Sequence, residues 1–189
     1  VVVVDDGSQD ASISHVLAFS KRLNLKVIRQ ANAGLAAARN AGASAIEACD
    51  YVMFLDSDDA LAPNAISTLV KMLERSQSDF AVGDCTRLKG LTRVPRVDTR
   101  SVFAPGSKSH VRFADEPEVI RDVTAWNKMF RWSFFKEQAI SFPVGVYFED
   151  MAEMTRAYVE ADAFDIVART VYLWRVRTEG ERSITQSSK

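Results

Sequence analysis

Carboxylates follow directly after two short apolar segments of the sequence. Val1–Val4 lead into Asp5 and Asp6, and Tyr51–Leu55 lead into an Asp-Ser-Asp-Asp segment at residues 56–59. Apolar runs that end in charge are typical of buried parallel strands, whose carboxyl ends form the ligand-binding edge of an open α/β sheet. Carboxylates gathered there repel one another unless a positive charge lies between them, and a hard divalent cation that holds a diphosphate meets that need. The pattern predicts a protein that handles a nucleotide.

The first acidic pair has the chemistry to recognise a nucleoside. A carboxylate at a strand end can accept a hydrogen bond from the imide N–H of a base or from ribose hydroxyls. Gly7 permits a tight turn directly after Asp5 and Asp6. The alternative is an Asx-type turn that caps the next helix. This segment alone leaves both open.

The Asp-Ser-Asp-Asp segment has the chemistry of a metal site. Its carboxylates offer oxygen ligands suited to Mg²⁺ or Mn²⁺ and can also reach a ribose. A metal held there would bridge a diphosphate and neutralise a departing nucleoside diphosphate. A turn with capping carboxylates is the alternative, but three aspartates within four residues favour the metal site.

Two further charged positions are ambiguous by themselves. Arg39 lies one turn into an Ala-rich segment, where it could reach a phosphate or a carboxylate, or be an ordinary surface residue. Glu149 and Asp150 begin a predicted helix, where the backbone dipole favours negative charge and capping is a sufficient explanation. The functional alternative makes Asp150 a general base.

An alternation of strands and helices is expected to position these side chains. The expected strands are Val1–Val4, Leu25–Ile28, Tyr51–Leu55, Phe80–Val82 and Ile166–Trp174, and the expected helices are Ala11–Leu23, Leu35–Ala48, Ala65–Arg75 and Glu149–Glu160. Their order predicts an α/β fold with a doubly wound, mostly parallel sheet flanked by helices, in the Rossmann-like manner. Residues 86–115 lack periodicity and predict a long mobile excursion over a site.

The composition is that of a soluble globular protein without a nucleic-acid surface. Of 189 residues, 47% are apolar, and 24 Lys and Arg residues nearly balance 25 Asp and Glu residues. We expect one domain, with a nucleotide-binding half at 1–88 and an acceptor-binding half at 89–189. Cys49 and Cys85 are expected to be buried free thiols, which fits a cytoplasmic protein. Peripheral attachment to the inner face of the membrane would require a region outside this sequence, since no apolar run has the length of a span.

Three segments taken together resemble the family-2 glycosyltransferases. They are Val-Asp-Asp-Gly-Ser-x-Asp at 4–10, Gln-x-Asn-x-Gly-x-x-x-Ala-Arg-Asn-x-Gly at 30–42 and Phe-Leu-Asp-Ser-Asp-Asp at 54–59. Later segments at 127–131, 142–150 and 172–177 look like the bacterial branch that builds surface and capsular polysaccharides. The resemblance implies the GT-A fold and an inverting enzyme. Such an enzyme transfers a sugar from a nucleotide-diphosphate sugar, usually a UDP-sugar, to a glycan or lipid-linked acceptor.

On the donor side, the resemblance implies a role for each aspartate of the first two acidic segments. Asp6, with Asp5 beside it, would recognise the base, usually uracil. Asp56 would contact the ribose and Asp58 would ligate Mn²⁺ or Mg²⁺ on the diphosphate. Asp59 would lie close to the sugar.

Three arginines complete the implied donor site. Arg39 would contribute to binding of the nucleotide sugar. Arg175 and Arg177, from a chain end that can fold back, would hold the departing phosphates as point charges or forks.

On the acceptor side, the resemblance implies that Asp150 deprotonates the acceptor hydroxyl. That hydroxyl attacks the anomeric carbon from the face opposite the diphosphate and inverts the configuration. Glu149, Asn127 and Lys128 would line the acceptor side.

Two features depart from the resemblance. Family members begin with a strand and a helix ahead of the position of Val1. We therefore expect part of the nucleotide pocket to be missing from this sequence and a strand edge to be uncovered. Residues 86–115 match no known pattern and are expected to hold acceptor specificity.

Three other functions share parts of this pattern. A phosphoacceptor receiver domain also carries acids at strand ends, but it is shorter and lacks the Ala-Arg-Asn-x-Gly helix and the late Glu-Asp pair. A sugar nucleotidyltransferase usually opens with a Gly-rich phosphate loop, which this sequence does not show. The intact Asp-Ser-Asp and Glu-Asp segments argue against a catalytically inert sugar-nucleotide-binding module, whereas the expected absence of the first strand keeps that alternative open.

Overall fold

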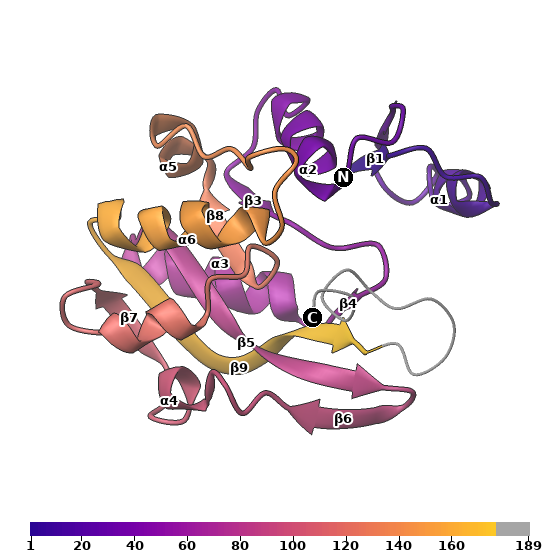
Figure 1. Ribbon diagram of the computed structural model, residues 1–189. Coiled ribbons are helices and arrows are strands. Elements are labelled where there is room, and N and C mark those ends of the chain that lie inside the picture. Colours follow the sequence, from indigo (N-terminus) through magenta and orange to yellow (C-terminus); the bar gives the residue numbers. More distant parts are fainter. Residues whose placement is uncertain (177–189) are drawn as a thin grey trace.

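A seven-stranded sheet lies at the centre of the structure, a computed structural model that describes residues 1–176 (Figure 1). Its central strands are ordered β3 (Tyr51–Met53), β8 (Lys128–Arg131), β5 (Phe80–Lys89), β9 (Phe164–Arg175) and β4 (Ala60–Leu61). Two strands lie off this path: β6 (Thr92–Pro95) pairs with β5, and β7 (Lys108–Val111) pairs with β9. Helices α3 (Ala65–Ser76) and α6 (Glu149–Glu160) contribute to the packing on the sheet.

A separate hydrophobic core lies on each face of this sheet. Phe80 of β5 packs in one core against Tyr158 of α6, with ring centroids 5.2 Å apart. Its neighbour Ala81 belongs to the other core, together with Leu69 of α3. Successive side chains of a strand point to opposite faces, so β5 serves both cores. α3 and α6 therefore cover opposite faces of the sheet.

The sheet is mixed because β8 inserts between two strands that run in the same direction. β3 and β5 both pair with β8 in antiparallel fashion, and Val52 and Phe80 both lie opposite Phe130. β5 and β9 pair in parallel. The α/β fold class with flanking helices is confirmed, while the sheet is mixed where a mostly parallel one was expected. The order of elements did not reveal this, because the strand that separates β3 from β5 follows both of them in the sequence.

The beginning of the chain forms a separate two-stranded parallel sheet. Its strands are β1 (Val2–Asp5) and β2 (Lys26–Arg29), joined through α1 (Ser12–Leu17). α1 is shorter than the helix expected over residues 11–23 and buries none of its side chains. The next helix, α2 (Leu35–Ser44), approaches β1 at Gly42, where an added Cβ would lie 3.3 Å from Cγ2 of Val4. An added Cβ at residue 42 would require the Val4 side chain to shift by a few tenths of an ångström.

Residues 86–115 are more regular than expected. β5 continues to Lys89, and the chain turns into β6 at Gly90, whose φ of 58° lies in the left-handed region. The short helix α4 (Arg100–Phe103) and β7 follow, and a 3₁₀ helix η1 spans Pro117–Arg121. The expected lack of regular structure in this segment is therefore wrong, because β6 and β7 pair with strands of the main sheet.

The late part of the chain is close to expectation. The strand expected over residues 166–174 is confirmed within β9, and the helix over 149–160 is confirmed as α6. A short helix, α5 (Trp132–Glu137), follows β8. Within residues 1–176, no helix has both the length and the apolar character needed to cross a membrane. Both cysteines are free, and Cys85 is buried as expected, but Cys49 is exposed.

Candidate active site

Arg39 of α2 joins segments that lie far apart in the sequence. Its side chain is only 5% exposed. Nη2 donates a hydrogen bond to Oδ1 of Asp56 at 2.8 Å, and Nη1 donates one to Oε1 of Glu149 at 2.6 Å. Oδ2 of Asp150 lies 4.0 Å from the same Nη1. The loop after β3 and the first turn of α6 are thereby held to α2 at one point.

Three carboxylates surround the single guanidinium group of Arg39, so negative groups are in excess at this point. Burial raises the pKa of Asp56, and the ion pair with Arg39 only partly opposes this effect; burial also raises the pKa of Glu149. Burial alone would lower the pKa of Arg39, but attraction to the neighbouring carboxylates outweighs it, so the pKa is raised. Arg39 therefore stays charged. Three carboxylates around one guanidinium form a site that a bound cation would stabilise.

Asn40, the next residue of α2, ties down the segment that precedes α6. Its Nδ2 donates to the carbonyl oxygen of Phe142 at 2.7 Å, and the N–H of Phe142 donates to Oδ1 of Asn40 at 2.8 Å. The ring of Phe142 also faces the guanidinium of Arg39, with Cζ 5.3 Å from the ring centroid. The sequence analysis assigned no role to Asn40, although its place directly after Arg39 was an available signal.

Tyr172 of β9 fixes the acidic loop after β3. Its hydroxyl accepts a hydrogen bond from the N–H of Asp56 at 3.1 Å and donates one to Oδ2 of Asp59 at 2.9 Å. Trp126 stacks on the Tyr172 ring with centroids 4.3 Å apart. Burial raises the pKa of Asp59 to about 6 and also raises that of Tyr172. The sequence did not reveal this contact, because it depends on the pairing of β4 with the distant β9.

Arg175 holds the same loop from the end of β9. Its N–H donates to Oδ1 of Asp59 at 2.7 Å, and its Nε donates to the carbonyl oxygen of Asp58 at 2.7 Å. The structure thus places Arg175 beside the predicted metal ligand, where a role in holding phosphates stays a prediction. Arg177, predicted for the same role, lies outside the described residues.

Asp6 organises the loop that leads into α2. Its Oδ1 accepts hydrogen bonds from the side chain of Gln30 at 2.8 Å and the N–H of Ala33 at 2.9 Å, and its Oδ2 accepts one from the N–H of Gly34 at 2.9 Å. Burial alone would raise the pKa of Asp6, but these hydrogen bonds outweigh it, so the pKa is lowered. The first acidic pair and the Gln-x-Asn-x-Gly segment therefore form one structural unit.

The carboxylate of Asp5 is bound by groups of the β1–α1–β2 unit. Its Oδ1 accepts a hydrogen bond from the N–H of Ser8 at 2.8 Å, and its Oδ2 accepts one from Nε of Arg29 at 3.2 Å. The hydrogen bonds from Ser8 lower the pKa of Asp5. The turn that we considered as an alternative for the first acidic pair is thus present at Asp5, but neither Asp5 nor Asp6 caps the following helix α1.

Asp150 reaches a backbone amide outside its own helix. Its Oδ2 accepts a hydrogen bond from the N–H of Ala125 at 3.1 Å, and its side chain is 13% exposed. With the contact of Glu149 to Arg39, both acids at the start of α6 have partners on other segments. Helix capping alone therefore does not account for this acidic pair.

Asn127 and Lys128 lie beneath the site, and neither has exposed surface. Nδ2 of Asn127 donates to the carbonyl oxygen of Gly83 at 2.8 Å. Nζ of Lys128 donates to the carbonyl oxygen of Thr124 at 2.7 Å. The structure therefore does not bring these two side chains to the acceptor side, where the resemblance placed them, because internal groups bind them.

Asp58 belongs to a loop whose donor set suits a hard cation. Among residues 1–176, no three or more His, Cys, Asp and Glu side chains are grouped to hold a metal by themselves. Mg²⁺ is commonly bound by one or two carboxylates together with substrate phosphates, so a complete protein cage is not required. The oxygen donors of the Asp-Ser-Asp segment, in a site with several carboxylates, fit that mode of binding.

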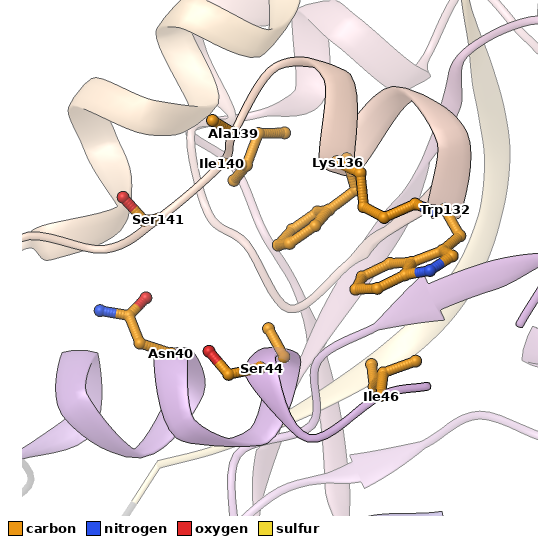
Figure 2. Close-up of a pocket in the computed structure, with 10 residues that line it drawn as sticks. Asn40, Ser44, Ile46, Trp132, Lys136, Ala139, Ile140 and Ser141 are labelled. Atoms are coloured by element: carbon orange, nitrogen blue, oxygen red, sulfur yellow. The ribbon is translucent and has the colours of Figure 1, made fainter. Parts of the chain in front are cut away.

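A cavity of about 280 Å³ lies between α2 and α5 (Figure 2). Asn40 and Ser44 line it from α2, and Trp132 and Lys136 line it from α5. None of the carboxylates that surround Arg39 lines this cavity, so it is distinct from the candidate active site.

Comparison with known proteins identifies relatives over most of the chain. A family model described as Glycosyl transferase family 2 matches residues 1–138. Glycosyltransferase GlyA of Streptococcus pneumoniae is 29% identical in an alignment of 190 positions that covers 94% of this chain and 26% of GlyA. A poly(ribitol-phosphate) beta-glucosyltransferase of Bacillus spizizenii is 29% identical over 184 residues, which cover 96% of this chain and 28% of that protein.

A solved structure shares the fold. The structure of TarS 1–349 of Staphylococcus aureus in complex with UDP-GlcNAc is similar with a TM-score of 0.84 and 26% sequence identity. The similarity covers 100% of this chain and 51% of the TarS chain. The chain thus spans only part of the proteins that it resembles.

Proposed function

Because the chain belongs to glycosyl transferase family 2, we propose that it forms the donor-binding and catalytic region of an inverting glycosyltransferase. A UDP-sugar is the proposed donor, since the similar TarS structure holds UDP-GlcNAc. The proposed acceptor is a hydroxyl of a glycan or lipid-linked intermediate in polysaccharide synthesis. The names of relatives that act on poly(ribitol-phosphate) support this class. The observation that carries the proposal is Arg39, which joins the acidic loop to Glu149 and Asp150.

On the donor side, the chain's own residues would bind the nucleotide and its diphosphate. Asp5 ends β1 and Asp6 follows it directly, and the proposal assigns the recognition of the base to these two residues. Asp56 uses one carboxylate oxygen for Arg39, and its second oxygen is suited to accept from a ribose hydroxyl. Asp58 would hold Mn²⁺ or Mg²⁺, which supplies positive charge against the departing diphosphate. Asp59, fixed by Tyr172, would lie near the sugar.

On the acceptor side, Asp150 would act as the general base. It takes the proton of the acceptor hydroxyl while that oxygen forms a bond to the anomeric carbon. The bond from the anomeric carbon to the diphosphate oxygen breaks on the opposite face, so the configuration inverts and the nucleoside diphosphate leaves. Arg39 and the amide of Ala125 hold Asp150 in place for this step.

A thermal-shift panel with UDP-, GDP-, CDP- and dTDP-sugars, each with and without Mn²⁺, tests the proposal. A ligand at a hundred times its dissociation constant stabilises a protein by about 2.7 kcal/mol, which shifts the melting temperature of a domain of this size by several degrees. We expect a Mn²⁺-dependent rise with UDP-sugars. If no nucleotide sugar stabilises the chain under either condition, the proposed donor site is contradicted.

A further inference from the structure

The backbone amide that reaches the proposed base belongs to a buried polar turn at residues 122–127. Ala125 donates its N–H to Oδ2 of Asp150 at 3.1 Å and has no exposed surface. The carbonyl of the same peptide group is that of Thr124, and it accepts a hydrogen bond from Nζ of Lys128 at 2.7 Å. One peptide plane therefore binds an ammonium at its oxygen and a carboxylate at its nitrogen.

The ammonium group of Lys128 makes all of its described hydrogen bonds within this turn. Besides the carbonyl of Thr124, Nζ donates to the carbonyl oxygen of Asp122 at 2.9 Å and lies 3.2 Å from Oδ1 of Asp122 and 3.2 Å from Oδ1 of Asn127. Contacts to several oxygens, two of them backbone carbonyls, fix the path of the turn on both sides of Ala125. A hydrogen bond to a carbonyl also polarises the N–H of the same peptide group and strengthens the bond that this N–H donates.

Gly83 and Arg96 connect the turn to the rest of the fold. Nδ2 of Asn127 donates to Oδ2 of Asp122 at 2.8 Å and to the carbonyl of Gly83 in β5 at 2.8 Å. Nη1 of Arg96 lies 3.6 Å from Oδ2 of Asp122. Burial would raise the pKa of Asp122, but Lys128 and Arg96 outweigh this and lower it, so the carboxylate stays charged. The turn is therefore attached to the central sheet through Asn127.

We propose that Lys128 is a positioning residue, which orients Asp150 through the peptide group that joins Thr124 to Ala125. The inference rests on the proposed role of Asp150 as the base. It gives Lys128 an indirect role, because a side chain with no exposed surface cannot touch the acceptor. The competing explanation is that Lys128 only pairs with Asp122 and stabilises the core.

A double-mutant cycle separates these two explanations. Lys128→Met removes the ammonium group and keeps a side chain of similar length. The substitution is made both in the wild-type chain and in the Asp150→Asn variant. The readout is UDP release from UDP-GlcNAc with Mn²⁺ and water as acceptor, with kcat and the donor KM determined separately. We expect Lys128→Met to lower kcat at least ~10-fold in the wild-type chain and less than ~2-fold in Asp150→Asn, because residues that act through one another are not additive. The donor KM should stay within about twofold in both chains.

Two further variants test whether the lower kcat of Lys128→Met reflects only a loss of stability. Lys128→Met leaves the buried carboxylate of Asp122 without its closest cation, whereas the double variant Lys128→Met/Asp122→Asn removes both charges and lowers that cost. The melting temperature of this double variant should be higher than that of Lys128→Met. Its kcat should remain as low as that of Lys128→Met. The matched control is Ser78→Ala, because Ser78 is buried and donates to Asp165 at 2.9 Å, away from the turn. It should lower the melting temperature and leave kcat unchanged.

Each outcome bears on a different claim. If Lys128→Met lowers kcat by the same factor with and without Asp150, or if Lys128→Met/Asp122→Asn recovers the wild-type kcat, then Lys128 serves stability alone and the inference is wrong. If Asp150→Asn keeps the wild-type rate, or the wild-type chain releases no UDP, then the proposed function fails first and the inference with it.

Discussion

The two acidic regions of the proposed donor site are held in different ways. At the end of β1, Asp5 and Asp6 are bound by groups of the same strand-helix-strand unit and the loop after it, such as Ser8 and Gly34. In the loop after β3, Asp56 and Asp59 are bound by Arg39 of α2 and by β9. Figure 1 shows the first unit, in indigo, beside the main sheet and the second loop leading into it. The first region is therefore organised within residues 1–34, whereas the second also needs segments more than 100 residues away in the sequence.

This difference has a consequence for energetics. Contacts within one unit form with little loss of chain entropy and can be removed with limited effect elsewhere. A contact such as that between Arg39 and Glu149, which are separated by 110 residues, fixes several segments at once. We therefore expect substitutions in the long-range region to affect stability and activity more strongly than comparable substitutions at the end of β1.

The largest effect on stability is expected at Arg39. Arg39→Met leaves the part-buried carboxylates of Asp56 and Glu149 without their shared cation, which should cost about 3 kcal/mol of unfolding free energy. Urea denaturation measures the loss. A change below about 1 kcal/mol would mean that the three segments are held together without Arg39.

The next prediction concerns Asp150. Asp150→Asn keeps the shape of the side chain but removes the base, so transfer should fall by at least ~10²-fold while UDP-sugar binding is kept. Rate measurements beside calorimetric titration of the donor check both parts. Full transfer by this variant would show that another group takes the proton.

Asp58 is expected to control the response to metal. Asp58→Ala should remove the Mn²⁺-dependent part of UDP binding, because the proposed carboxylate ligand is lost. Ser57→Ala, at the neighbouring position of the same segment, is the matched control and should keep it. If Mn²⁺ still enhances UDP binding to Asp58→Ala, the metal ligand has been assigned to the wrong residue.

A smaller effect is expected at Tyr172. Tyr172→Phe removes only the hydroxyl that joins the N–H of Asp56 to the carboxylate of Asp59, which should cost about 1–2 kcal/mol of stability. The donor KM should also rise, since the loop loses its contact with β9. An unchanged melting temperature and KM together would show that β9 does not hold the loop.

The smallest effect is expected in the locally organised region. Arg29 is 71% exposed, so Arg29→Met should change the unfolding free energy by less than about 1 kcal/mol even though Arg29 pairs with Asp5. Measured beside Arg39→Met, it compares an ion pair whose arginine is 71% exposed with one whose arginine is 5% exposed. Equal losses in the two variants would remove the distinction between the two regions.

The sequence predicted those parts of the site that depend on local order. Apolar runs that end in aspartates are strands β1 and β3, and the Glu-Asp pair begins α6 as expected. The α/β class follows from the same alternation of elements. These features need only neighbouring residues, whose periodicity and charge are visible in the chain.

What the sequence did not predict depends on which distant segments pair. The insertion of β8 between β3 and β5, and the contact of Tyr172 with the acidic loop, arise from strand order in the sheet. The burial of Lys128 follows from the same insertion, because β8 lies inside the sheet. The resemblance implied a place on the acceptor side for Lys128, and the hydrogen bond from its Nζ to the carbonyl of Thr124 shows that the side chain is bound internally.

A crystal structure of the chain with UDP-GlcNAc and Mn²⁺ tests the central claim most directly, namely that Arg39 assembles one site from distant acidic segments. The account predicts that Mn²⁺ contacts Asp58, that the sugar lies between the acidic loop and Asp150, and that Arg39 remains bound to Asp56 and Glu149. A nucleotide sugar bound elsewhere, for example in the cavity between α2 and α5, would contradict it.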